Sequence, residues 1–228
     1  MMNSEQRVIP LQIRIDPAEA AQTLQPSPSR SPASRLIELA RGLIAETRSL
    51  LCPMGVYVIH DVEEMTESAL RMHGCPVIEG PIARFLKPAR RVAAFVATVG
   101  PQIESAARHR MDRGDILEGH LLDAIGTVAA DAAADALIDH MLWNDVRPDE
   151  AVLPPLCPGY CGLPLDQQTP LFAIVDAGAI GVQLSPAMAI RPLKSVSGLV
   201  GIGNHAEVLD HGVPCEWCDQ EQCGLQNG

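Results

Sequence analysis

Apolar residues recur every three or four positions in two long parts of the chain, the spacing of amphipathic helices. Residues 33–51 form the first part, with apolar positions at Leu36, Leu39, Leu43, Ile44 and Leu50. Residues 101–141 form the second part, which is interrupted near Gly114. After that break, an alanine-rich helix is expected over 116–141, because one of its faces carries Leu121, Leu122, Ile125, Val128 and Ala132. A shorter helix is predicted for residues 166–175.

Short apolar and β-branched runs predict the strands. The candidate strands are residues 7–15, 55–60, 75–79, 92–98 and 194–202. They come in groups, and the helices between them follow no regular strand–helix–strand period. The pattern therefore predicts an α+β fold in which helices flank a twisted antiparallel sheet.

Composition divides the chain of 228 residues into three parts. Residues 1–34 contain the first strand and then a Pro/Ser-rich segment, 25–34, that is typical of a linker or loop. Residues 35–213 are expected to form the main α+β domain, since 47% of the whole chain is hydrophobic and can bury a full core. Residues 214–228 form a polar, Cys-rich tail, and Trp217 is the only apolar anchor of its Cys-containing segment, 214–223.

The net charge of −11 argues against nucleic acid or an anionic membrane surface as a partner, because binding to either uses clustered Lys and Arg. The N-terminus lacks the continuous apolar segment of a signal peptide, and no stretch approaches the ~18 apolar residues of a membrane span. A cytoplasmic location is therefore expected. The dense basic cluster of the chain is predicted to be a solvated surface turn, and it consists of Arg84, Lys87, Arg90 and Arg91.

Several common catalytic and nucleotide-binding motifs do not occur in the sequence. It has no P-loop and no Gly-x-Ser-x-Gly segment, so nucleotide hydrolysis and serine hydrolase chemistry have no support. Gly198, Gly201 and Gly203 fall within a strand-like run, where they permit close backbone approach and do not form a dinucleotide site.

Two motifs between Cys157 and Gly203 are the most informative part of the chain. In the first, Pro158-Gly159-Tyr160, glycines flank the tyrosine, so the loop can turn sharply while its backbone groups stay available to a ligand. The second is Ser195-Val196-Ser197-Gly198, in a predicted strand.

In this order, the two motifs resemble the activation (reactivation) domain of cobalamin-dependent methionine synthase. Weaker similarity upstream involves Thr98-Val99-Gly100-Pro101 and Leu122-Asp123-Ala124-Ile125-Gly126. The resemblance covers roughly residues 90–203 and reaches the first third of the chain only in outline.

The resemblance implies binding of S-adenosylmethionine (SAM) and docking onto a cobalamin-carrying methionine synthase or a related corrinoid protein. In that family, a flavodoxin-type donor reduces cob(II)alamin while SAM supplies the methyl group; a ferredoxin-type donor is the other possibility for this chain. Gly159 and Tyr160 match the family's SAM-binding Gly-Tyr, and Cys157 matches a position whose backbone contacts SAM. Asp131 stands where the long helix usually offers a glutamate to the SAM amino group. No catalytic residue is implied, because the nucleophile is cobalt on the partner and this chain contributes proximity and orientation.

Three positions depart from the family pattern. Pro155 stands where the family has an arginine for the SAM carboxylate, and Val208 and Leu209 replace a tyrosine pair. Asp131 is one methylene shorter than the usual glutamate. Two hypotheses therefore stay open. The chain is either a stand-alone SAM-binding reactivation protein, or a docking or electron-transfer module that has lost SAM and carries a metal site.

The tail supplies the candidate metal ligands Cys215, Cys218 and Cys223, spaced as Cys-x2-Cys-x4-Cys. In a chain without a secretory signal, three thiols this close favour zinc or an iron–sulfur cluster. The simpler alternative is a dithiol with an incidental third cysteine. The candidate fourth donors are Cys157, Cys161, His205 and His211.

Four further cysteines lie outside the tail. Cys52 and Cys75 are predicted to be core residues. Cys157 and Cys161 bracket the Gly-Tyr turn and are either metal ligands or small buried residues.

Overall fold

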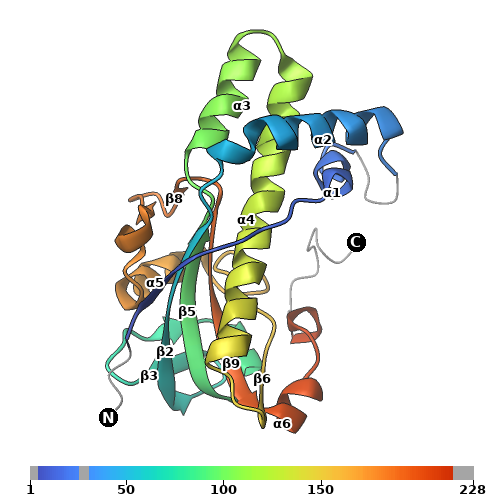
Figure 1. Cartoon of the computed structure of the whole chain (residues 1–228). Coiled ribbons are helices and arrows are strands. Elements are labelled where there is room, and N and C mark those ends of the chain that lie inside the picture. Colours follow the sequence, from blue (N-terminus) through green and yellow to red (C-terminus); the bar gives the residue numbers. More distant parts are fainter. Residues whose placement is uncertain (1–4, 26–30, 218–228) are drawn as a thin grey trace.

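An antiparallel sheet lies at the centre of the computed structural model, which describes residues 5–25 and 31–217 (Figure 1). Within these residues, the sheet has seven strands in the order β4-β3-β2-β5-β9-β6, and β1 pairs with β2 as well. β7 and β8 form a separate two-stranded sheet. The strands are β1 Arg7–Pro10, β2 Met54–Met65, β3 Ala69–Met72, β4 Ile78–Glu79, β5 Ala89–Thr98, β6 Glu150–Val152, β7 Gln183–Leu184, β8 Ile190–Arg191 and β9 Ser195–Asn204.

Helices and short helical turns connect and cover the strands. The α-helices are α1 Pro17–Gln22, α2 Ser34–Thr47, α3 Gln102–Asp112, α4 Ile116–Asn144, α5 Gln168–Ile174 and α6 His205–Leu209. The 3₁₀ turns are η1 Arg48–Leu50, η2 Pro81–Leu86, η3 Leu165–Gln167, η4 Ala177–Ile180 and η5 Pro214–Trp217. All strand pairs are antiparallel, so the predicted α+β class is confirmed.

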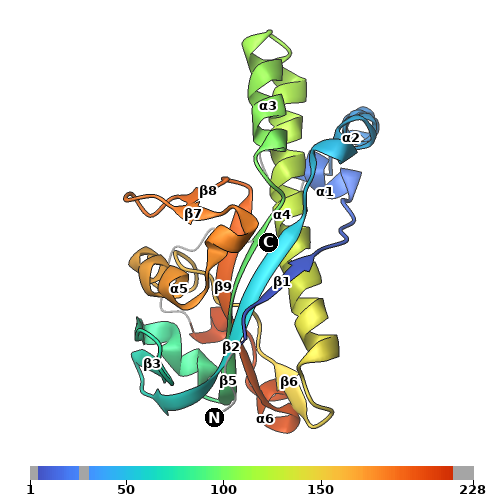
Figure 2. The same cartoon turned by 60° about the vertical axis from the view of Figure 1, so that its left-hand side comes forward.

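The sheet separates two hydrophobic clusters, and β5 contributes to both of them. Ala93, Phe95 and Ala97 point into the cluster under α1, α2 and α4, while Val92, Ala94 and Val96 point into the cluster that includes η2 and α5. Because side chains alternate along a strand, a continuous apolar run is what a strand covered on both faces requires. Figure 2 shows the two layers on opposite sides of the sheet.

The long helix α4 and its partner α3 form a hairpin whose tip extends beyond the sheet (Figures 1 and 2). Gly114 joins them with φ +90°, a conformation that favours glycine, as the predicted interruption required. Leu121, Leu122, Ile125 and Val128 are buried as predicted, whereas Ala132, on the same predicted face, is half-buried. The small residues of α4 let it lie close to the sheet.

The N-terminal segment packs against the rest of the fold. The strand predicted over 7–15 ends at Pro10, because its partner β2 begins at Met54 and the last contact is Leu11 N–H to Pro53 C=O at 3.0 Å. The helix α1 was not predicted from the sequence; it begins after Asp16, which caps it, and buries Ala20 and Ala21.

Two further predictions were wrong in detail. Cys52 is exposed instead of buried: it lies in the connection between η1 and β2, where its backbone N–H donates to Val99 C=O and its side chain stays outside the core. The strand predicted over 75–79 shortens to β4, which leaves Cys75 half-buried just before it. The other predicted helices and strands are present with small shifts at their ends. No helix in the described part of the chain is long and apolar enough to span a bilayer.

Candidate functional site

The two motifs identified in the sequence lie side by side in the structure. After β6, the backbone of Leu156 exchanges two hydrogen bonds of 2.9 Å with Leu199, next to the Ser-Val-Ser-Gly segment of β9. Gly198 makes this approach possible. A Cβ atom there would lie 2.8 Å from the Phe95 ring and 3.0 Å from the Leu156 carbonyl oxygen. The second motif therefore holds the start of the loop that carries the first.

The loop is a series of tight turns that presents Tyr160. The Tyr160 N–H donates to Cys157 C=O at 3.0 Å, and Gly159 N–H donates to Leu163 C=O at 2.8 Å. Gly159, Cys161 and Gly162 have φ of +94°, +49° and +78°, so three residues of the loop have positive φ. The Tyr160 side chain is 57% exposed and is free to contact a ligand. The Cys157 N–H forms no hydrogen bond with another described residue.

Asp131 and Cys157 come from distant parts of the sequence and interact in the fold. Desolvation, followed by the nearby Asp131 carboxylate and Cys161 thiol, raises the pKa of Cys157 to about 11. The thiol is therefore protonated at neutral pH and is a poor nucleophile or metal ligand in that state. This arrangement suits binding through the loop backbone better than covalent chemistry.

The setting of Asp131 is acidic. Partial desolvation, then Asp135 one turn along α4 and Glu19 of α1, raise the pKa of the Asp131 carboxyl. Lys194 opposes this rise, but its ammonium group is already bound to Asp123 at 2.8 Å and to the Thr127 hydroxyl at 2.9 Å. Asp131 is exposed, and its side chain forms no hydrogen bond or ion pair within 5–25 and 31–217. It can accept a cationic group from a ligand.

Sequence reasoning missed two of these neighbours. Lys194 packs along α4 over Gly126, and its side chain is only 11% exposed. The spacing of Asp123, Thr127 and Asp131 by single helical turns was a usable signal for a polar stripe on α4. Glu19 gave no signal, because its helix was not predicted.

The positions that depart from the family pattern offer no substitute charge or aromatic ring. Pro155 is exposed in the loop before Leu156. On α6, Val208 is buried in the core while Leu209 is 66% exposed. Four hollows of about 180, 430, 680 and 830 Å³ lie elsewhere on the described surface. Asp131, Cys157, Gly159 and Tyr160 line none of these four.

The proposed metal ligands Cys218 and Cys223 lie outside the described residues, and the side chain of Cys215 is not described either. The start of the tail is attached to the domain through Trp217. Its ring stacks on His211 at 4.4 Å between centroids, and its Nε1–H donates to His211 C=O at 3.0 Å. Among residues 5–25 and 31–217, no group of three His, Cys, Asp or Glu side chains is placed to hold a metal ion.

These features define an antiparallel α+β protein in which one long helix and a glycine-bounded loop share a surface. More particularly, the fold is that of the MetH reactivation domain. A crystal structure of the MetH reactivation domain bound to AdoHcy matches with a TM-score of 0.67 and 15% sequence identity, over 88% of this chain and 79% of that one. No protein-family model matches the sequence, and no curated protein matches it. The predicted methionine synthase activation-domain-like fold is confirmed.

Proposed function

We propose that this chain is a reactivation module for a cobalamin-dependent methionine synthase or a related corrinoid methyltransferase. In this role it binds SAM and supports reductive methylation of cob(II)alamin on the partner. The observation that carries the proposal is that the Asp131 carboxylate lies near enough to the Cys157 thiol, at the start of the Gly-Tyr loop, to help raise its pKa. This proximity occurs in a fold whose solved example holds AdoHcy, which is SAM without the methyl group.

The residues of this surface fit the chemistry of SAM, which carries a sulfonium, an ammonium and a carboxylate group. Asp131 would accept hydrogen bonds from the ammonium group, and the acidic neighbours Asp135 and Glu19 would favour the positive end of the ligand. The unpaired Cys157 N–H would donate to the ligand, and Tyr160 would contact it through its exposed ring. SAM supplies the methyl group, while these residues orient it.

The partner supplies the cobalamin, and an electron donor of flavodoxin or ferredoxin type supplies the reducing equivalent. An acidic donor needs a basic patch, and the basic cluster of the sequence is not the solvated turn that was predicted, because Arg84 lies in η2 and Arg90 and Arg91 lie in β5. Arg84 donates to Trp217 C=O and Arg91 is paired with Glu150, so Lys87 and Arg90 are the exposed members. The proposal therefore concerns mainly the contact with the cob(II)alamin-loaded partner and gives less weight to direct contact with the electron donor.

An anaerobic methylation assay tests the proposal directly. The cognate corrinoid protein is loaded with cob(II)alamin and supplied with reductant, and methylcobalamin is followed by absorbance with and without this chain and SAM. We expect formation that requires both, and we expect Asp131→Asn to slow it at limiting SAM more than Asp139→Asn, a change on the same helix. Equal rates without this chain would contradict the proposal.

A second candidate function is a docking or electron-transfer module that has lost SAM and holds zinc or an iron–sulfur cluster in its tail. Pro155 and Leu209 favour it, since neither can replace the family's arginine or tyrosine. His211 also favours it. Its buried Nε2 has no hydrogen-bond partner among the described residues, and it precedes Cys215 by four positions. Elemental analysis after anaerobic purification separates the two, because a protein without iron or zinc rules this candidate out.

A further inference from the structure

The largest hollow among the four lies between the N-terminal segment and the end of α2. After β1 ends, residues 11–15 continue in extended form without a partner strand. On the other side of the hollow, η1 and residues 51–53 connect the end of α2 to β2. No hydrogen bond holds residues 12–15 to another described residue. The gap that opens between the two segments has a volume of about 830 Å³, which is within the range of small-molecule sites.

The walls of this hollow, named here the Arg48 slot, are mostly apolar. The lining residues are Leu11, Gln12, Ile13, Arg14, Ile15, Ile44, Arg48, Leu51 and Pro53. The apolar members are only half-buried, so they leave hydrophobic surface in contact with water. Covering that surface with an apolar ligand is favourable.

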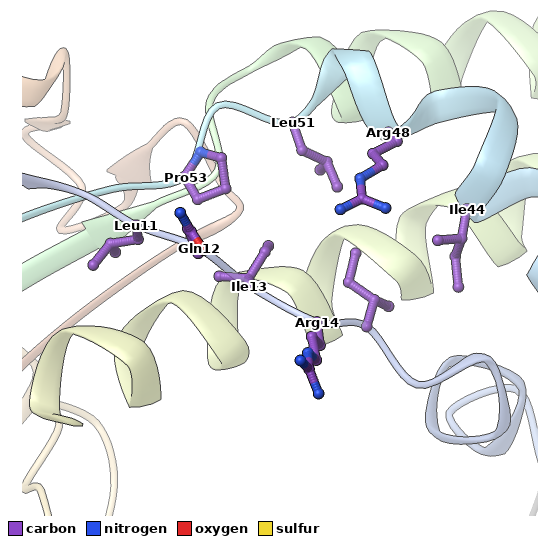
Figure 3. A pocket seen from close by; sticks show the side chains of 9 residues that line it. Leu11, Gln12, Ile13, Arg14, Ile44, Arg48, Leu51 and Pro53 are labelled. Carbon is purple, nitrogen blue, oxygen red and sulfur yellow. The ribbon is translucent and has the colours of Figure 1, made fainter. Parts of the chain in front are cut away.

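One cation is directed into the Arg48 slot. Figure 3 shows the Arg48 guanidinium group reaching from η1 into the space between Leu51 and Ile13, while Arg14 points away from that space. The Arg48 side chain forms no ion pair or hydrogen bond with any residue that the structure describes. In a chain with 28 acidic and 17 basic residues, an arginine without an acidic partner above an apolar slot favours an anion.

We propose that the Arg48 slot binds a small organic anion with an apolar body, of the alkyl carboxylate class. The carboxylate pairs with the Arg48 guanidinium, and the alkyl chain lies between Ile13 and Ile15 on one wall and Ile44 and Leu51 on the other. None of these residues is among the proposed SAM contacts. The two sites are therefore distinguishable by which variants and which backbone amides respond.

Octanoate is the probe, with 1-octanol as the uncharged analogue and acetate as the analogue without an apolar body. Each is titrated into ¹⁵N-labelled full-length protein, and amide shifts are followed by NMR. We expect octanoate to move the amides of residues 11–15 and 44–51 in a saturable way, and to bind about tenfold more tightly than 1-octanol or acetate.

Arg48→Met removes the charge and keeps an apolar side chain at an exposed position, so folding should be retained. It should lower octanoate affinity about tenfold, and Arg48→Lys should lower it less. Arg41→Met is the matched control, because Arg41 lies on α2, outside the slot, and is paired with Glu38. Asp131→Asn should leave octanoate binding unchanged.

Three results would overturn the proposal: octanoate shifts that avoid both segments, equal affinities for octanoate and 1-octanol, or equal losses in Arg48→Met and Arg41→Met. Loss of SAM binding with retained octanoate binding would count against the proposed function alone.

Discussion

Replacing Gly198 with alanine tests whether β9 positions the candidate binding loop. The added methyl group would lie 2.8 Å from a Phe95 ring carbon and 3.0 Å from the Leu156 carbonyl oxygen, both closer than ordinary van der Waals contact. Phe95 is fully buried, and Leu156 is held by its two hydrogen bonds to Leu199. The strain therefore falls on the core or on the loop. Overpacking of this kind costs about 1–3 kcal/mol of unfolding free energy.

For a chain of this size, that cost lowers the melting temperature by about 2–4 °C per kcal/mol, which calorimetry resolves easily. Gly42→Ala is the matched control. No atom lies within 4 Å of its added methyl group, so helix propensity should stabilise the protein by up to about 1 kcal/mol. Gly198→Ala should also weaken SAM binding, because it displaces Leu156 just before Cys157. A Gly198→Ala protein that melts less than about 2 °C below the unsubstituted protein would refute this expectation, because the smallest expected cost, about 1 kcal/mol, lowers the melting temperature by about 2 °C.

Three further predictions concern single side chains. Asp131→Asn should lower SAM affinity about tenfold. Because the pKa of Asp131 is raised, the SAM affinity of the unsubstituted protein should fall on acidification at a higher pH than it would for an ordinary aspartate. Calorimetric titrations with SAM across pH measure this fall, and an affinity that does not change with pH would contradict the prediction. The Tyr57 hydroxyl donates to the Asp145 carboxylate at 2.5 Å, and burial raises the pKa of Tyr57 to about 12. Because this pKa is higher in the folded protein than the usual value near 10, the stabilisation is complete below about pH 10 and is lost between about pH 10 and 12. Denaturant unfolding of Tyr57→Phe should show a smaller loss over that window than the unsubstituted protein; an equal loss would contradict the assignment. Exposed Cys52 should react with iodoacetamide at pH 8 well before Cys157, whose pKa is about 11, and mass spectrometry showing the reverse order would disprove the assigned environments.

The sequence was sufficient to predict most of the regular structure. α2, α4 and β5 have strong periodic or continuous apolar patterns, and each is buried on the faces those patterns require. The end of β1 was not predictable, because residues 11–15 keep the alternating pattern after the partner strand has turned away. The exposed position of Cys52 likewise depends on tertiary structure, since a free cysteine is ordinarily buried.

The candidate site was predictable only in parts. The glycines around Tyr160 identified a tight loop, and the helical period placed Asp131 on α4, but neither pattern says that the two meet. Their proximity depends on Leu156 pairing with Leu199, a contact between residues far apart in sequence. Glu19 joins them from a helix whose pattern is too short to recognise.

Titrating SAM into the ¹⁵N-labelled protein shows whether the Gly-Tyr loop and Asp131 form a SAM site. We expect saturable binding of one SAM per chain, with the largest amide shifts at Cys157, Gly159 and Tyr160 and at Asp131 on α4, and weaker binding in Asp131→Asn. SAM at millimolar concentration that moves none of these amides, or that binds Asp131→Asn as tightly as the unsubstituted protein, would contradict it.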